Sequence, residues 1–226
     1  ARTQRRRHLM FLEAALWQAR GATPWRDLPP GFGKWTGVHA RFRRGALAGV
    51  RERLFKALAD SPDFEYVFVD ATVCQVHADA TGAKWGLPQG IGRSRGGLTP
   101  EPHVGVDALG LPLRVAPTPG RWGDAPQAAG LVSDVPSVAH VIAEPPGADP
   151  FRSLIRDGLR AEAQFPSNPS RARPCPLDAQ LYAESRLIET FFNRLKRFRR
   201  IALRCEKTLP AFMGFVHLAC AMIWLR

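Results

Sequence analysis

The chain has 226 residues, 45% of them hydrophobic, and a formal net charge of +12 at pH 7. Such a chain can bury a substantial core, and we expect one main domain with an appendage. Residues 1–56 carry 13 Lys and Arg against 3 Asp and Glu, residues 171–226 carry 11 against 4, and the middle carries 8 against 13. Basic ends around an acidic centre favour a nucleic-acid partner over a merely soluble basic surface.

The cysteines and the apolar runs indicate the cellular compartment in which the chain is expected. Four cysteines are scattered without a CxxC pair or zinc-finger spacing, which indicates reduced, mostly buried thiols in a cytosolic protein: Cys74, Cys175, Cys205 and Cys220. The first residues lack the apolar core of a signal peptide. The apolar run Ala211–Leu225 contains His217 and is too short to span a bilayer, so it predicts a buried terminal helix and no membrane contact.

The first quarter of the chain predicts helices. Residues 8–20 have helical periodicity and end at Gly21, and a second helix over roughly 38–59 carries five arginines. Small basic helices with tryptophans in or between them could form a helix-turn-helix-like DNA-binding unit. Any small basic bundle shares this pattern, so the alternative stays open.

The middle of the chain predicts a mixed α/β domain. The run FEYVFVDATVCQV is β-branched and aromatic, which predicts a strand through Asp70. The other expected elements are a loop over 90–97, a hairpin over 103–117 with its turn at Asp107–Gly110, a helix near 124–133, a strand ending at Glu144, a helix of about eight residues, a weak strand near 160–164 and a proline-rich connector over 166–178.

The run YAESRLIETFFNRLKRFRR is the most informative stretch. Drawn as one helix, it places four polar residues along one face: Tyr182, Arg186, Glu189 and Lys196. A separate apolar stripe can anchor the helix in a core: Ile188, Phe191, Phe192, Leu195 and Phe198. A carboxylate flanked by cations suits an acid that meets a metal or a phosphate, whereas an amphipathic surface helix with ordinary charge pairs is the alternative.

Three carboxylates lie on separate predicted elements. Asp70 and Glu144 end strands, and Glu189 lies on the helix just described. Together they could hold two divalent ions for phosphoryl transfer, and hard oxygen ligands favour magnesium or manganese over zinc. For each acid alone, a cap or turn role is the competing interpretation.

Ordered matches run along nearly the whole chain, among them PWRDLPPGFGKWTGVHARFRR, YVFVDATVCQVHADATGAKWG, GRSRGGL, HVGVDALGLPLR and the terminal YAESRLIETFFNRLKRFRRIALRCEKT. The chain resembles the bacterial DDE transposases of the "insertion sequence five" type. The resemblance implies a ribonuclease-H-like α/β catalytic domain over residues 61–226 behind a helical, basic DNA-binding segment over 1–60. It further implies metal-dependent cleavage and strand transfer of double-stranded DNA at terminal inverted repeats, by a cytoplasmic, nucleoid-associated homo-oligomer that also binds target DNA.

The resemblance assigns the acids one by one. Asp70 matches the family's first acid and Glu189 the third, while Tyr182 and Lys196 match its signature helix. The second acid has two alignments: Glu144 occupies the position when aligned from the strand, and Ala143 when aligned from the following ADPF. A glutamate there displaces the carboxyl by about 1 Å relative to the family's aspartate, an error that can cost on the order of a hundredfold in rate.

The DNA contacts follow the same resemblance, with departures. Arg93 and Arg95 lie in a glycine-rich stretch and are expected to contact phosphates. Arg186 follows Ser185, which holds the family's arginine position, so its guanidinium is rotated by about 100° on a helix; it stands three residues before Glu189 and could pair with it. Glu101 stands where the family tends to have lysine.

Two histidines and a basic run have competing interpretations. His77 and His103 match family positions near the first acid and could touch DNA, although a satisfied, half-buried histidine is the favoured interpretation for each. The run Lys196, Arg197, Arg199 and Arg200 predicts either DNA contact or a solvated helix face.

Three functions therefore compete. The leading hypothesis is a DDE transposase, either fully active or impaired by its altered second acid, and the alternative is a catalytically inactive remnant that only binds DNA. An RNA-binding protein is disfavoured, because neither an aromatic RNP-type strand nor a KH-type GXXG loop is present.

Overall fold

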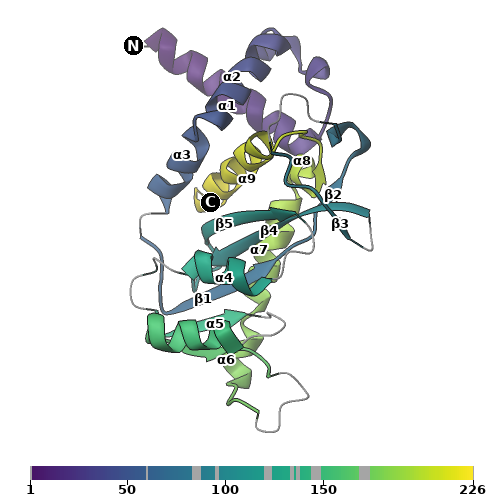
Figure 1. The fold of residues 1–226 in the computed structure, drawn as a ribbon. Helices are drawn as coiled ribbons and strands as arrows, with labels where there is room; N and C mark the ends of the chain where they lie inside the picture. The colour runs from purple at the N-terminus through teal and green to yellow at the C-terminus, as the bar shows by residue number, and fades with distance from the viewer. Residues whose placement is uncertain are drawn as a thin grey trace. The chain divides into compact units, whose positions relative to one another are not determined.

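The computed structural model describes residues 2–59, 61–82, 88–94, 97–119, 124–132, 135, 138–143, 149–167 and 174–225. The fold is mixed α/β and contains two compact units (Figure 1). Unit 1 consists of Ala1–Leu58, Cys74–Gly90 and Arg194–Arg226, and unit 2 of Ala59–Val73 and Ile91–Asn193. Each unit is therefore assembled from segments that are distant in the sequence.

Unit 2 is built on a mixed sheet, six-stranded in the described residues. Its strands are β1 (Tyr66–Ala71), β3 (Gly92–Ser94), β4 (Gly97–Val106), β5 (Pro112–Pro119), β6 (His140–Ala143) and β7 (Glu162–Gln164). β1 is central, antiparallel to β4 and parallel to β6; β5 pairs with the far side of β4, and β7 is parallel to β6. The predicted strands through Asp70 and towards Glu144, the hairpin and the weak strand near 160–164 are confirmed.

One strand was not expected. The glycine-rich stretch over 90–97 was predicted to be a loop, but Gly92–Ser94 forms β3 and pairs with β4 in antiparallel register, with Arg93 opposite Leu98. The prediction is wrong for these three residues because ladder hydrogen bonds come from the backbone and tolerate glycine when a neighbouring strand offers its edge.

The hairpin turn is fixed by a buried aspartate. Asp107 is fully buried, and its Oδ1 accepts hydrogen bonds from the N–H groups of Leu109 at 3.0 Å and Leu111 at 2.8 Å. Its Oδ2 accepts from the N–H of Asp63 at 3.3 Å. Burial raises the pKa of Asp107, although these backbone N–H groups oppose the rise. The carboxylate is thus committed to the turn at Asp107–Gly110, where Gly110 adopts a φ of 72°.

The core of unit 2 lies between the sheet and its helices. α4 (Asp124–Val132) and α5 (Asp149–Ser153), which continues as a π-helix over Leu154–Gly158, pack on the apolar residues of the inner strands. The buried members of this cluster are Val67, Val69, Ala128, Leu131, Val132, Val138, Val141, Ala143, Phe151, Ile155, Ala161 and Phe165. The expected helix near 124–133 is confirmed by α4.

Phe165 is expected to carry much of this core's stability. It is fully buried, and its ring stacks on Phe151 with centroids 5.9 Å apart. Phe165→Ala should lower the free energy of unfolding by about 3–5 kcal/mol in a urea titration. Leu109→Ala, at a side chain that is 65% exposed, should change it by less than about 0.5 kcal/mol. Equal effects of the two substitutions would contradict the placement of this core.

Unit 1 is mostly helical. Its helices are α1 (Arg2–Gly21), α2 (Trp35–Leu47), α3 (Val50–Leu58), α8 (Arg199–Ala202) and α9 (Leu209–Trp224), with short 3₁₀ turns at Trp25–Asp27, Pro30–Phe32 and Ala78–Ala80. β2 (Gln75–Val76) pairs in parallel with β8 (Leu203–Arg204). α2 and α3 pack against α9 (Figure 1). The apolar residues of α9 are largely buried, so the predicted buried terminal helix is confirmed.

The single helix predicted over 38–59 is wrong. It is divided into α2 and α3, because Gly49 adopts a positive φ of 63° between them and breaks the α-helical path. The helix predicted over 8–20 is confirmed by α1, which ends at Gly21 as expected. In the described part of the chain, no helix is long and apolar enough to cross a membrane.

The four thiols are free, as predicted, with Cys74 and Cys220 buried. Burial raises the pKa of Cys74 to about 11 and also raises the pKa of Cys220. Because the thiolate is the reactive form, both cysteines should resist a maleimide reagent near neutral pH in the native protein and react only on unfolding. Mass spectrometry of the labelled protein measures this difference. Rapid labelling of Cys220 in the folded chain would contradict its burial in α9.

Candidate functional site

The first candidate acid lies in the central strand of unit 2. Asp70 is half-buried near the end of β1, opposite Val104 of β4. Its Oδ1 accepts a hydrogen bond of 2.7 Å from the N–H of Ala71, which orients the carboxylate. The buried apolar residues that precede it, Val67 and Val69, hold β1 in the core, so the acid stands on a rigid element.

The second candidate acid, Glu144, lies outside the described residues, and so does Arg95, one of the two arginines expected to contact phosphates. What is described is the strand that leads to Glu144. In the parallel pairing of β1 with β6, Val69 is opposite Ala143. Val69 directly precedes Asp70 in the sequence, and Ala143 directly precedes Glu144.

The third candidate acid is on the surface of a well-anchored helix. Glu189 is exposed in the first turn of α7 (Arg186–Lys196). The predicted apolar stripe is buried at every position, from Ile188 and Phe191 to Phe198. A carboxylate near a helix N-terminus is also favoured by the helix dipole.

The single helix expected through Tyr182 and Lys196 is wrong. Tyr182 lies on α6 (Ala179–Ala183), which ends before the turn at Glu184 and Ser185. The N–H of Ser185 donates to the carbonyl of Tyr182, a bond across three residues that tightens the chain into a turn. The four-residue face therefore divides, and Tyr182 does not share the helix of the other three.

Arg186 has a different partner from the one considered. Its Nη2 donates to both carboxylate oxygens of Glu184 at 3.1 Å, and no ion pair with Glu189 is found in the described residues. Both side chains are substantially exposed, so this pair contributes less than about 1 kcal/mol to stability. It nevertheless turns the Arg186 guanidinium away from the role expected beside the third acid.

The remaining basic candidates divide between surface and core. Arg93 is exposed on β3, and Lys196 and Arg197 are exposed at the end of α7. Arg200 is neither a solvated residue nor one open to DNA: its side chain is 4% exposed and forms an ion pair with Glu206 at 2.7 Å. Both interpretations of the basic run are therefore wrong for Arg200.

The two histidines have ordinary structural partners. His103 lies on β4 and forms a hydrogen bond of 2.8 Å between its Nε2 and the hydroxyl of Thr118, so it is satisfied as the favoured interpretation predicts, but it is fully buried rather than half-buried. His77 is exposed, and its Nδ1 accepts a hydrogen bond of 3.2 Å from the N–H of Asp79 at the start of a 3₁₀ turn. His77 is thus satisfied but not half-buried. At Glu101, where the family tends to have lysine, the backbone carbonyl accepts a hydrogen bond of 3.3 Å from the hydroxyl of Thr118; the Glu101 carboxylate plays no part in that bond.

Buried arginines of unit 1 were missed by sequence reasoning. Arg204 is fully buried and donates to the backbone carbonyls of Gln89, Gly90 and Glu206. Burial lowers the pKa of Arg204 to about 10, which still leaves it charged at neutral pH. Arg51 is similarly buried, and its guanidinium lies 3.9 Å from the centre of the Phe42 ring. The only sequence signal was the position of each arginine beside apolar residues.

The donor chemistry of the candidate acids fits a hard divalent cation. Asp70 and Glu189 offer carboxylate oxygens only, which suits magnesium or manganese. Among the described residues, no group of three His, Cys, Asp or Glu side chains is placed to hold a metal ion. Glu144 is not among those residues, because the description of β6 ends at Ala143. The chemical type of the Asp70 and Glu189 side chains therefore fits a magnesium or manganese ion.

The comparisons with known proteins identify the class of protein. A family model described as "Putative transposase of IS4/5 family" matches residues 1–55. A Brucella ovis protein named "Putative transposase for insertion sequence element IS6501" is 58% identical over 130 residues, which make up 57% of this chain and all of that protein. The chain therefore belongs to the IS4/5 family of insertion-sequence transposases.

A second relative is more distant. The "Uncharacterized protein y4sN" of Sinorhizobium fredii is 35% identical over 107 residues, 47% of this chain and 79% of that protein. No solved structure matches the chain. The family assignment confirms the resemblance drawn from the ordered sequence matches.

Proposed function

We propose that the chain is a metal-dependent DNA transposase that cleaves and transfers strands at insertion-sequence ends, with Asp70, Glu144 and Glu189 as its acids. The observation that carries the proposal is the strand register. Val69 of β1 and Ala143 of β6 are directly opposite, and each directly precedes a candidate acid. Side chains at equivalent positions of adjacent parallel strands project to the same side of a sheet.

The strand order supports a ribonuclease-H-like fold for unit 2. β1, β4 and β5 form an antiparallel set, which the short β3 extends at the start of β4. Two parallel strands, β6 and β7, follow on the other side of β1. Ribonuclease-H-like domains have this arrangement, with the first strand in the centre. The helical segment over residues 1–60 would then act as the DNA-binding part, together with residues 74–90 and 194–226, which fold into the same unit. The rest of the expected catalytic domain over 61–226, which is unit 2, would act as the catalytic part.

The proposed chemistry assigns a role to each acid. Asp70, Glu144 and Glu189 would hold two magnesium or manganese ions, which when bound supply an activated oxygen nucleophile and stabilise the leaving oxygen of a phosphodiester. The N–H of Ala71 orients the Asp70 carboxylate, and the buried stripe of α7 fixes the helix that carries Glu189. Preorganised oxygens of this kind need little rearrangement when the DNA arrives.

DNA binding is assigned to the exposed cations. Arg93, Lys196 and the basic N-terminal helices present guanidinium and ammonium groups suited to phosphates. Arg95 is proposed as a further DNA contact from its place in the glycine-rich stretch, and Tyr182 from the family resemblance. Arg186 is proposed as an exposed cation next to the family's arginine position. Terminal inverted repeats and target DNA would be the substrates, bound by a homo-oligomer.

The test is a nicking assay on labelled DNA that carries the element's terminal inverted repeats. The chain should produce strand breaks with about 5 mM Mg²⁺ or Mn²⁺ and none with EDTA. Glu144→Asp should preserve or raise the rate, because it restores the shorter acid. Unchanged DNA affinity with no metal-dependent nicking, even in Glu144→Asp, would sink the catalytic proposal.

The alternative is an inactive remnant that only binds DNA. Two observations favour it: the second acid is a glutamate, and Arg186 is held by Glu184. The nicking assay separates the two functions, since a remnant binds the DNA without cutting it under any metal condition.

A further inference from the structure

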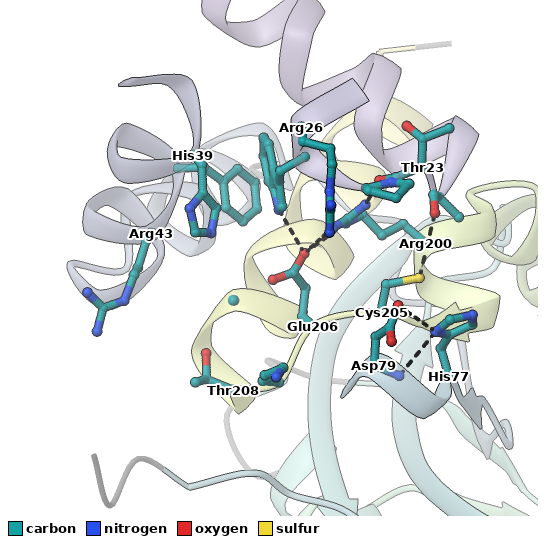
Figure 2. A pocket seen from close by; sticks show the side chains of 16 residues that line it. Thr23, Arg26, His39, Arg43, His77, Asp79, Arg200, Cys205, Glu206 and Thr208 are labelled. Carbon is teal, nitrogen blue, oxygen red and sulfur yellow. Dashed lines mark hydrogen bonds and ion pairs between the residues drawn. The ribbon is translucent and has the colours of Figure 1, made fainter. Parts of the chain in front are cut away.

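A pocket lies within unit 1, and none of the proposed acids lines it. Its volume is about 510 Å³, within the usual range for ligand pockets. The segment after α1 (residues 22–24), the 3₁₀ turn at Trp25–Asp27, α2 and the first turn of α9 contribute to its wall. Figure 2 shows the pocket: His39 and Arg43 project from α2 on one side, and Glu206 and Thr208 lie across from them.

The floor of the pocket is charged but neutralised. Glu206 Oε1 accepts from Arg200 Nε at 2.7 Å and from the indole N–H of Trp25 at 3.3 Å. Arg200 Nη1 donates to Gln18 Oε1 at 2.9 Å and to the carbonyl of Thr23 at 2.7 Å. Both charged side chains are nearly inaccessible, so the pair forms a rigid base and leaves little charge for a ligand.

The rim of the pocket is cationic. Arg26, Arg43 and Lys207 line it, all three are exposed, and none forms an ion pair with a carboxylate in the described part of the chain. Besides Glu206, the pocket is lined by the carboxylate of Asp79, whose Oδ2 lies 3.5 Å from the Nδ1 of His77. Burial lowers the pKa of His39, so this histidine adds no charge at neutral pH. The rim is therefore positive.

The start of α9 adds one backbone donor to the same pocket. Thr208, the residue before α9, makes no side-chain hydrogen bond to the helix, although threonine commonly caps this position. Thr208 and Ala211 both line the pocket, and the N–H of Ala211 has no hydrogen bond within the described residues. In this first turn the N–H of Leu209 donates to the carbonyl of Pro88 and Pro210 has no N–H, so Ala211 supplies the open donor. A helix N-terminus carries partial positive charge and favours anions.

We infer that this pocket binds the phosphates of a DNA strand, with Arg26, Arg43 and Lys207 as its ligands and the N–H of Ala211, at the start of α9, as a backbone donor. Three cations from three separate segments, a neutral rigid floor and one open helix N–H match a chain of phosphodiesters. This inference rests on the proposed function and adds to it a DNA-binding surface outside the acidic site.

The experiment measures the affinity of a fluorescein-labelled DNA duplex by anisotropy at several salt concentrations, with Arg26→Gln, Arg43→Gln, Lys207→Gln and the triple variant. For each phosphate that the protein no longer neutralises, the slope of log affinity against log salt should become shallower by about 0.9, and for the triple variant by about 2.7. Arg156→Gln is the charge-matched control, because Arg156 is exposed in unit 2 and paired with Asp157 at 2.7 Å; its slope should equal that of the wild type.

The outcomes distinguish the two proposals. A wild-type slope in the triple variant, with its melting curve unchanged, would overturn the phosphate pocket and leave the transposase proposal intact. The phosphate pocket would equally be overturned if the triple variant lost affinity only for free deoxyadenosine monophosphate, which would make the pocket a nucleotide site. Failure of the wild-type chain to bind the duplex at about 50 mM salt would remove DNA binding itself.

Discussion

Asp70→Asn is expected to lower metal-dependent DNA nicking by at least about a hundredfold, because the missing carboxylate removes several kcal/mol of ion-mediated stabilisation. The amide has the same shape and can still accept from the Ala71 N–H at Oδ1, so β1 should stay folded. DNA affinity at constant salt should be unchanged. Glu189→Gln should show the same loss of nicking, because it removes another proposed metal ligand. α7 should stay folded, since the exposed Glu189 carboxylate has no role in the buried stripe.

The control for this result is another exposed carboxylate of unit 2. Glu162 lies on β7, and its Oε2 is 3.4 Å from His140 Nδ1. Glu162→Gln removes one negative charge without touching a proposed acid, and nicking should stay within about twofold of the wild type. A similar decrease in Glu162→Gln would mean that net charge, and not the proposed site, governs the reaction.

Glu206→Gln is expected to lower the free energy of unfolding by about 3–5 kcal/mol, because it leaves the buried Arg200 guanidinium without its counter-charge. The two side chains are 4% and 9% exposed, and the ion pair spans 2.7 Å. Removing one charge of a buried pair costs far more than the pair itself contributes, since the remaining charge stays desolvated. A urea titration followed by circular dichroism measures the change.

Two comparisons separate this effect from a general loss of charge. The double variant Arg200→Met/Glu206→Leu should recover most of the stability, because two apolar side chains bury without an unpaired charge. Lys56→Ala should cost less than about 0.5 kcal/mol, since the Lys56–Glu52 pair has side chains 67% and 45% exposed. A small effect of Glu206→Gln would contradict the rigid floor of the pocket in unit 1.

Local chemistry explains which elements the sequence predicted well. The turn at Asp107–Gly110 and the strand through Asp70 depend on neighbouring residues, an Asp side chain that bonds its own backbone and a β-branched run. The apolar run at the C-terminus predicted α9 for the same reason. The single residue Gly49 was enough to divide the second predicted helix, because one positive φ redirects the chain.

Long-range partners explain what the sequence could not predict. Arg200 is buried because Gln18 and the carbonyl of Thr23, about 180 positions earlier in the chain, satisfy its guanidinium. No local pattern distinguishes such an arginine from its exposed neighbour Arg199. Of the proposed site, the sequence predicted the elements that carry Asp70 and Glu189, whereas the tight turn after Tyr182 depends on hydrogen bonds that spacing alone does not reveal.

The most direct test of the shared metal site is metal-directed cleavage of the protein chain. Fe²⁺ bound in place of Mg²⁺, with ascorbate and peroxide, generates radicals that cut the backbone close to the ion, and mass spectrometry locates the cuts. Three clusters of cuts, beside Asp70, Glu144 and Glu189, all suppressed by excess Mg²⁺ and by Asp70→Asn, are predicted. Cuts beside only one of these acids, or cuts that Asp70→Asn leaves unchanged, would contradict a site built from all three.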